Sequence, residues 1–197
     1  VCDGSHIYMQ KFERGIPKSE LEIVGDTTER GTRITFKADP EIFKETDHYE
    51  YEVLQARLRE QAFLNAGVKI VLTDSRDAEN PKEDVFSYEG GIKSFVEYIH
   101  KKRGLSGIHD DIIDFSGTLL DGTSSGEVAF QYNDSYNSLI LSFANNIHTD
   151  DGGTHEDGFK RAITKVINEY AKKYNLLKDN DKKFSGDDVR EGLTAII

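Results

Sequence analysis

A glycine pair between an apolar run and a long amphipathic stretch is the feature that most limits how this chain folds. Residues 139–144 read Leu-Ile-Leu-Ser-Phe-Ala, which is typical of a β-strand. Residues 155–170 repeat apolar side chains every three or four positions, which predicts an α-helix with one apolar face. Gly152 and Gly153 lie between them, so the sequence predicts a strand, a glycine-rich turn and a helix. Such a turn presents free backbone N–H groups where anions bind.

Phosphate binding at this turn is one interpretation, and the neighbouring residues argue against it. The turn lacks the Lys-Ser/Thr ending of a P-loop and the spacing of a dinucleotide fingerprint. Four acidic residues flank it: Asp150, Asp151, Glu156 and Asp157. Carboxylates at a helix start satisfy its positive end and repel an incoming anion. We therefore favour Thr154 as the N-cap with Asp157 three residues on, and keep a phosphate-handling enzyme as an alternative.

The rest of the pattern predicts a mixed α/β fold. Strands are expected at residues 6–13, 21–24, 31–37, 68–73, 85–88, 112–115, 127–132, 139–144 and 193–197. Helices are expected at residues 51–66, 92–103 and 155–170, with a short one after a Ser-x-x-Asp capping pattern at Ser185. Two long helices, each apolar on one side, suggest a sheet with helices on one face. Gly158 costs up to about 1 kcal/mol in a helix, so we interpret it as a packing site.

The net charge of −11 argues against a free-standing nucleic-acid binder, because phosphate contacts dominate that kind of affinity. Charge is unevenly spread, however. Residues 160–173 hold five basic side chains and one acidic one: Lys160, Arg161, Lys165, Lys172, Lys173 and Glu169. A solvated helix surface explains this stripe on physical grounds alone. A surface that faces polyanionic DNA is the sharper hypothesis.

The sequence shows no pattern typical of a disulfide-bonded, zinc-binding or membrane protein. A single cysteine, Cys2, excludes an internal disulfide and a cysteine-based zinc site, and a reducing cytoplasm fits best. No apolar run approaches the roughly 20 residues that a membrane span needs, and no signal peptide is visible. The chain begins with Val1, so we expect a piece of a longer protein. His148 and His155 lack the spacing of a metal site, and no catalytic set is apparent.

Six stretches spread over the whole chain match one known family in its own order. They are residues 12–17 (FERGIP), 31–36 (GTRITF), 57–65 (RLREQAFLN), 88–93 (YEGGIK), 145–159 (NNIHTDDGGTHEDGF) and 186–193 (GDDVREGL). Any one of them is a weak signal, but the six together are highly specific. The chain resembles the B subunit of bacterial DNA gyrase and, less closely, its topoisomerase IV counterpart.

The resemblance implies a domain layout. Residues 1–46 would be the last strands of an incomplete GHKL-type ATPase domain, and residues 47–67 a connecting helix. Residues 68–197 would form a C-terminally truncated transducer domain, an α/β fold with a left-handed βαβ crossover. The family's catalytic glutamate, magnesium-binding asparagine and glycine-rich lid would precede Val1, and its Gln-Thr-Lys loop would follow Ile197. We therefore expect no catalytic residue and no metal site in this piece, and no ATP hydrolysis by it.

The resemblance also implies a function for the intact protein. It would transmit ATP binding and hydrolysis to DNA strand passage and negative supercoiling, with ATP and magnesium as cofactors. Its partners would be the gyrase A protein, DNA and, once ATP binds, a second copy of the gyrase B protein, whereas this piece is expected to be monomeric and to bind no membrane. Thr32 would lie in the nucleotide pocket, and Lys160, with Arg161 and Lys165, would face the cavity that receives DNA. A topoisomerase IV piece and a non-catalytic α/β protein-binding module remain the alternatives.

Overall fold

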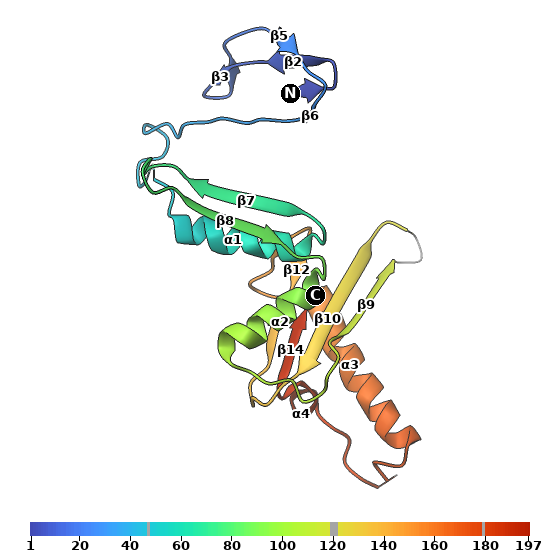
Figure 1. Cartoon of the computed structure of the whole chain (residues 1–197). Helices are drawn as coiled ribbons and strands as arrows, with labels where there is room; N and C mark the ends of the chain where they lie inside the picture. Colours follow the sequence, from blue (N-terminus) through green and yellow to red (C-terminus); the bar gives the residue numbers. More distant parts are fainter. Residues whose placement is uncertain (47, 119–121, 179) are drawn as a thin grey trace. The chain divides into compact units, whose positions relative to one another are not determined.

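The computed structural model describes residues 1–46, 48–118, 122–178 and 180–197. Two compact units make up the chain, Val1–Glu50 and Tyr51–Ile197 (Figure 1). Residue 47, where the connecting helix was expected to begin, lies outside the described residues.

The first unit is a small antiparallel sheet with one extra hairpin. The sheet has the order β5-β2-β1-β6, formed by β1 (Cys2–Asp3), β2 (His6–Met9), β5 (Glu22–Asp26) and β6 (Arg30–Gly31). The hairpin pairs β3 (Phe12–Glu13) with β4 (Ile16–Pro17), so the strand predicted over residues 6–13 is split in two. None of the described residues among 1–50 is buried, in keeping with the few short strands that the sequence predicted there.

The strand predicted over residues 31–37 is wrong beyond its first residue. β6 ends at Gly31, and the side chains of Ile34 and Phe36 are 81% and 71% exposed. Alternating apolar residues form a strand only where a neighbouring strand pairs with them and an apolar surface covers one face. Within the described part of residues 1–50, no strand pairs with residues 32–37.

The second unit begins with helix α1 (Tyr51–Leu64), which packs against the antiparallel hairpin of β7 (Lys69–Asp74) and β8 (Lys82–Ser87). Tyr51 donates a hydrogen bond of 2.6 Å from its hydroxyl to Asp84 on β8. At the other end of α1, Phe63 stacks on Tyr88 with ring centres 3.7 Å apart, and on Phe95 of helix α2 (Ile92–Arg103) at 4.8 Å. The aromatic stack joins α1 to α2.

The main sheet has the order β11-β14-β10-β9 and is mixed in direction. Its strands are β9 (Ile113–Thr118), β10 (Ser125–Tyr132), β11 (Leu139–Leu141) and β14 (Leu193–Ile196). β14 runs parallel to β11 and antiparallel to β10. Between β11 and β14 the chain passes through helices α3 (Thr154–Lys173) and α4 (Gly186–Arg190), which makes a βαβ unit. Its left-handed sense, implied by the resemblance, stays a prediction.

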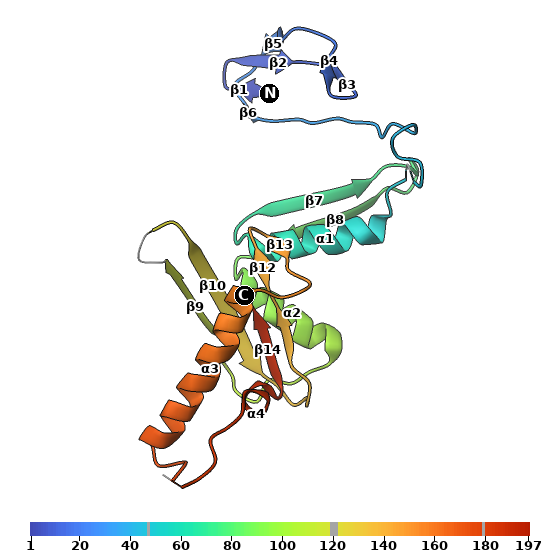
Figure 2. The ribbon, with the colours of Figure 1, turned by 180° about the vertical axis from the view of Figure 1, so that it is seen from behind.

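The mixed α/β fold is confirmed, but helices cover both faces of the sheet instead of one. Ala129 and Ile196 pack with Phe95 and its neighbours on α2. The next residue of β10, Phe130, packs with Phe159 of α3. Because successive side chains of a strand point to opposite faces, apolar residues at both positions require a cover on each side. Figures 1 and 2 show α2 and α3 on opposite faces of this sheet.

The predicted strand 139–144 is interrupted at Ser142. β11 ends before it, and β12 (Phe143–Ala144) starts a separate hairpin with β13 (Ile147–His148). The two-residue loop of this hairpin, Asn145 and Asn146, has φ values of 50° and 65°. Both residues therefore adopt the left-handed conformation that a tight hairpin turn needs.

Two predictions about helix starts have different outcomes. The capping box of α4 is confirmed, because Ser185 and Asp188 exchange hydrogen bonds between side chain and backbone. Thr154 is not the N-cap of α3, because Gly153 occupies that position without a side-chain cap. The positive φ of Gly152 (73°) turns the chain early, so that Thr154 is already helical.

The interpretation of Gly158 as a packing site is also wrong. It is exposed, and an added Cβ would have no neighbour within 4 Å. Gly192, by contrast, has a φ of +69°, and a Cβ there would lie 2.6 Å from the carbonyl oxygen of Asn133. An alanine would therefore clash with the backbone at position 192 and meet no neighbour at position 158.

We expect Gly192→Ala to destabilise the chain by at least about 2 kcal/mol, because it combines backbone strain with a clash. Gly158→Ala should instead stabilise it by about 0.5–1 kcal/mol, because alanine is the better helix former. Urea unfolding followed by circular dichroism measures both changes. Equal effects of the two substitutions would contradict the geometry described for Gly192.

Candidate functional site

A basic groove runs between α3 and the segment that leads into α4. It has a volume of about 600 Å³ and is lined by six basic residues and one acidic residue: Lys160, Arg161, Lys165, Lys172, Lys183, Arg190 and Glu169. We call it the α3–α4 groove. The structure thus brings the three predicted DNA-facing residues together in one place, within a chain whose net charge is −11.

Side-chain amide contacts hold the two walls of the groove together. Asn168 of α3 donates from Nδ2 to the carbonyl oxygen of Phe184 at 3.0 Å and accepts from its backbone N–H at 2.9 Å. The hydroxyl of Tyr132 on β10 donates to the carbonyl oxygen of Val189 at 2.7 Å, which ties α4 to the sheet. Residues far apart in sequence are therefore fixed side by side.

Lys183 and Arg190 are groove residues that the sequence analysis missed. Lys183 lies in a polar segment without regular structure, and Arg190 ends a short helix, where it pairs with Asp187 at 2.7 Å. No periodic pattern relates either residue to the stripe on α3. The capping pattern at Ser185 predicted the short helix α4, but it did not predict that α4 lies beside α3.

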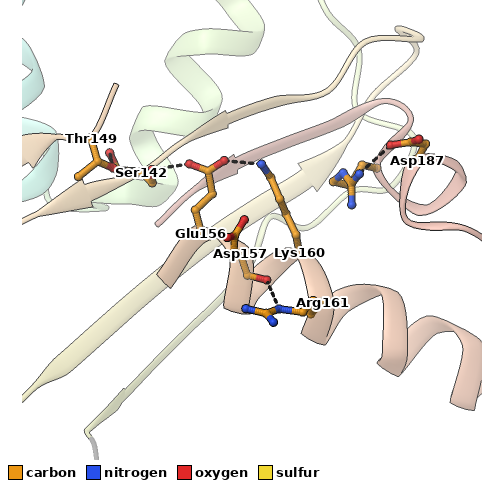
Figure 3. Close-up of polar contacts among 8 residues, drawn as sticks. Ser142, Thr149, Glu156, Asp157, Lys160, Arg161 and Asp187 are labelled. Carbon is orange, nitrogen blue, oxygen red and sulfur yellow. Dashed lines mark hydrogen bonds and ion pairs between the residues drawn. The ribbon is translucent and has the colours of Figure 1, made fainter. Parts of the chain in front are cut away.

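An ion pair fixes Lys160, one of the groove residues. Its ammonium donates to Oε1 of Glu156, one turn earlier on α3, at 2.5 Å. The other oxygen of Glu156 accepts a hydrogen bond of 2.6 Å from the hydroxyl of Ser142, a residue that is only 1% exposed (Figure 3). Thr149 Oγ1 lies 2.6 Å from the same hydroxyl oxygen. The charge of Lys160 is thus connected to the buried break between β11 and β12.

Burial of Glu156 opposes its charged form and by itself raises the pKa of this carboxyl group. Hydrogen bonds from Lys160 and Ser142, together with the positive charge of Lys160, act in the opposite direction and outweigh burial. The pKa of Glu156 therefore lies below its ordinary value, and the carboxylate is charged at neutral pH.

The other two predicted residues are held loosely. Arg161 donates from Nε to the backbone oxygen of Asp157 at 3.2 Å, within its own helix. Lys165 lies 3.8 Å from Glu169, and both side chains are mostly exposed. Exposed pairs of this kind contribute little to stability, so both cations are available to an external anion. Chemically, the groove can bind phosphate groups through charge and N–H donors.

Thr32 lies in the first unit, directly after β6, and its side chain is exposed. It lines an open cleft of about 1480 Å³ whose walls include Ile7, Val24 and Ile34. The lining also includes charged side chains, among them Glu29, Arg30 and Arg33. Within the described ranges, no group of three or more His, Cys, Asp or Glu residues could hold a metal ion.

A carboxylate lies beside the glycine turn. A Cβ at Gly152 would lie 3.3 Å from Oε2 of Glu156, so this oxygen lies close to the turn. A phosphate at the same place would be repelled by it. His148 pairs with Asp150 beside the turn at 2.5 Å. This geometry argues against the phosphate-handling enzyme.

Comparison with known families decides what the chain is related to. The family model described as DNA gyrase B matches residues 91–197, which is more than half of the chain. The chain belongs to the DNA gyrase B family. The resemblance read from the six sequence stretches is thereby confirmed, and a topoisomerase IV origin or an unrelated protein-binding module is not favoured.

Curated members of the DNA gyrase B family cover the whole chain. The DNA gyrase B protein of Clostridium acetobutylicum is 53% identical over 197 residues, which are 100% of this chain and 30% of the relative. That of Halalkalibacterium halodurans is 51% identical over 97% of this chain and 29% of the relative. That of Bacillus mycoides is 49% identical over 99% of this chain and 46% of the relative. The chain therefore spans less than half the length of each of these relatives.

Solved structures of gyrase B share this fold. The 43K ATPase domain of Thermus thermophilus gyrase B, in complex with an aminocoumarin, has a TM-score of 0.82 at 39% identity, over 98% of this chain and 51% of that one. The gyrase B protein of Myxococcus xanthus has a TM-score of 0.78 at 21% identity, over 100% and 54%, which shows the fold alone. In the part of this gyrase B chain that the structure describes, no helix has the length and apolar character to cross a membrane.

The lowered pKa of Glu156 has a consequence for stability that depends on pH. A carboxyl group whose pKa is lowered by folding stabilises the folded state fully when the pH is above its pKa in the unfolded chain. This contribution disappears as the pH falls through its pKa in the folded chain. We expect the stability difference between the wild-type chain and Glu156→Gln to be full above about pH 4.5, the ordinary value, and to shrink below it. Chemical unfolding at a series of pH values measures this difference.

Glu169→Gln removes the same charge from the exposed pair on α3 and serves as the control. It should change stability by less than about 0.5 kcal/mol. A pH dependence of equal size for both variants would contradict the role assigned to the pair of Glu156 and Lys160.

Proposed function

We propose that this chain is the part of a DNA gyrase B protein that relays ATP binding and hydrolysis to DNA strand passage and negative supercoiling. Residues 1–46 would end a GHKL ATPase domain, residues 47–67 connect it, and residues 68–197 act as the transducer. The observation that carries the proposal is the α3–α4 groove, whose six basic residues stand out in an acidic chain. A positive groove on an otherwise negative surface attracts the DNA backbone and orients it.

The contacts of α1 support a relay toward this groove. Gln61 donates to the backbone oxygen of Asn146 at 2.8 Å, and Asn146 donates to the side-chain oxygen of Asn65 at 2.9 Å. α1 therefore holds the tip of the β12–β13 hairpin, which leads into the glycine turn and α3. A displacement of α1 would be passed to α3 if the two states of the enzyme differ in these contacts.

Cofactors and partners of the intact enzyme belong to the same proposal. Thr32 would contribute to the base side of an ATP site, and ATP with magnesium would supply the free energy for strand passage. The gyrase A protein and DNA would be partners, two gyrase B proteins would pair when ATP binds, and this piece alone would be monomeric. A cytoplasmic location accords with this assignment.

Reversing the charge of Lys160 tests the DNA-facing role. In the intact protein, Lys160→Glu should reduce DNA-stimulated ATP hydrolysis about tenfold, because it replaces an attraction to phosphate by a repulsion. Nucleotide binding without DNA should be unchanged. Lys101→Glu makes the same charge change at an exposed site on α2, outside the groove, and should leave the stimulation nearly intact. Equal loss of nucleotide binding and DNA stimulation in Lys160→Glu would count against the proposal.

Isolated residues 1–197 should not hydrolyse ATP. Hydrolysis needs a metal and a water-activating group placed at the phosphates, and the resemblance matches no residue of this chain to the family's catalytic glutamate or magnesium-binding asparagine. Phosphate release by the purified chain with ATP and magnesium should equal that of the buffer. Stoichiometric turnover that disappears in Thr32→Ala would contradict this expectation.

A further inference from the structure

We infer that Glu156 is a positioning residue for DNA binding: it holds the ammonium of Lys160 in the α3–α4 groove so that its remaining N–H donors can meet a DNA phosphate. This inference rests on the proposed function, since it assigns a role to a residue behind the DNA-facing surface. Glu156 does not line the groove itself. It acts through Lys160.

Both oxygens of the Glu156 carboxylate are engaged, and in opposite directions. Oε1 accepts from Lys160 at the groove, whereas Oε2 accepts from the hydroxyl of Ser142 in the interior. Thr149 stabilises this anchor, because its hydroxyl donates to the carbonyl oxygen of Ser142 at 2.9 Å. The Glu156 side chain is 13% exposed and the Lys160 side chain 32%, so the carboxylate is the more restricted end of the contact.

A second pair on the same helix shows what an unanchored pair looks like. Lys165 and Glu169 have the same spacing of four residues, but they lie 3.8 Å apart with side chains 75% and 66% exposed. The α3–α4 groove thus contains one lysine that is fixed by a carboxylate bonded to the buried Ser142, and one that is not. This contrast provides a matched control within one helix.

Fixing a lysine before a phosphate arrives has a physical advantage. The long lysine side chain loses much rotamer freedom when it is immobilised, and a preordered side chain has already lost it. An ammonium has three N–H donors, so one bond to Glu156 leaves two for phosphate oxygens. A glutamate that holds a lysine toward phosphates serves the same purpose in phosphoryl-transfer enzymes.

Charge and positioning predict opposite results when Glu156 is neutralised. If only charge mattered, Glu156→Gln would make the groove more positive and would strengthen DNA binding. If Glu156 positions Lys160, the same substitution releases the lysine and weakens DNA binding although the net charge becomes more favourable. The sign of the change therefore separates the two explanations.

The experiment uses the intact protein and a linear DNA duplex of random sequence, with DNA affinity and DNA-stimulated ATP hydrolysis measured at several salt concentrations. We expect Glu156→Gln to weaken DNA binding by roughly threefold to tenfold, which lies in the lower part of the range of couplings between directly contacting side chains. Glu169→Gln, which removes the same charge from the groove lining, should make binding slightly tighter, as charge alone predicts. Ser142→Ala, which removes the anchor without changing charge, should weaken binding in the same direction as Glu156→Gln.

A double-mutant cycle shows whether the effect passes through Lys160. In a Lys160→Gln background, Glu156→Gln should have no further effect on DNA binding. A loss that persists in that background would mean that Glu156 acts through the fold, and the inference would be overturned. Tighter binding by Glu156→Gln, or a change equal to that of Glu169→Gln, would also overturn it.

The failure of the inference can be told apart from failure of the proposed function. If Lys160→Gln weakens DNA binding but Glu156→Gln does not, only the positioning role is lost. If Lys160→Gln has no effect on DNA binding, the DNA-facing role of the groove fails, and the inference fails with it.

Discussion

Strand β14 carries the contacts on which both layers of helices depend. Its residues, Leu193 to Ile196, are at most 1% exposed, and it pairs with β10 on one side and β11 on the other. Ile196 packs toward α2, while Leu193 and Ala195 pack toward α3 and α4. Because β11 and β14 are parallel, the chain between them must cross the sheet, and α3 is that crossing. The crossing buries one side of α3 and leaves its basic side facing outward.

The break at Ser142 connects this apolar body to the charged surface. Ser142 separates β11 from β12 and is 1% exposed, so its hydroxyl does not bond to solvent. Instead, the buried hydroxyl of Ser142 bonds to Glu156, and Glu156 bonds to Lys160. Buried polar groups of this kind are stable only when they are paired, so the network is held in one arrangement. Through the β12–β13 hairpin, the same region is in contact with α1.

Much of the fold follows from local pattern, and the deviations have physical causes. The spacing of apolar residues predicted α1, α2, α3 and most strands, because apolar residues recur at a short, fixed interval in a helix or strand with one apolar face. The strand predicted at 31–37 does not form beyond Gly31, since alternation cannot supply a pairing strand. Helices on both faces were missed because Ala129 and Phe130, adjacent in β10, are both core residues that face opposite sides.

The sequence by itself determined the family, the mixed α/β class, the main helices and the basic stripe of α3, because each depends on residues close together along the chain. The tertiary structure alone decided that Lys183 and Arg190 face this stripe and that Glu156 is anchored by Ser142. Those contacts join segments that are brought together only when α3 crosses the sheet between β11 and β14. Local periodicity carries no information about which side chains meet across such a crossing, since their spacing along the chain has no fixed repeat.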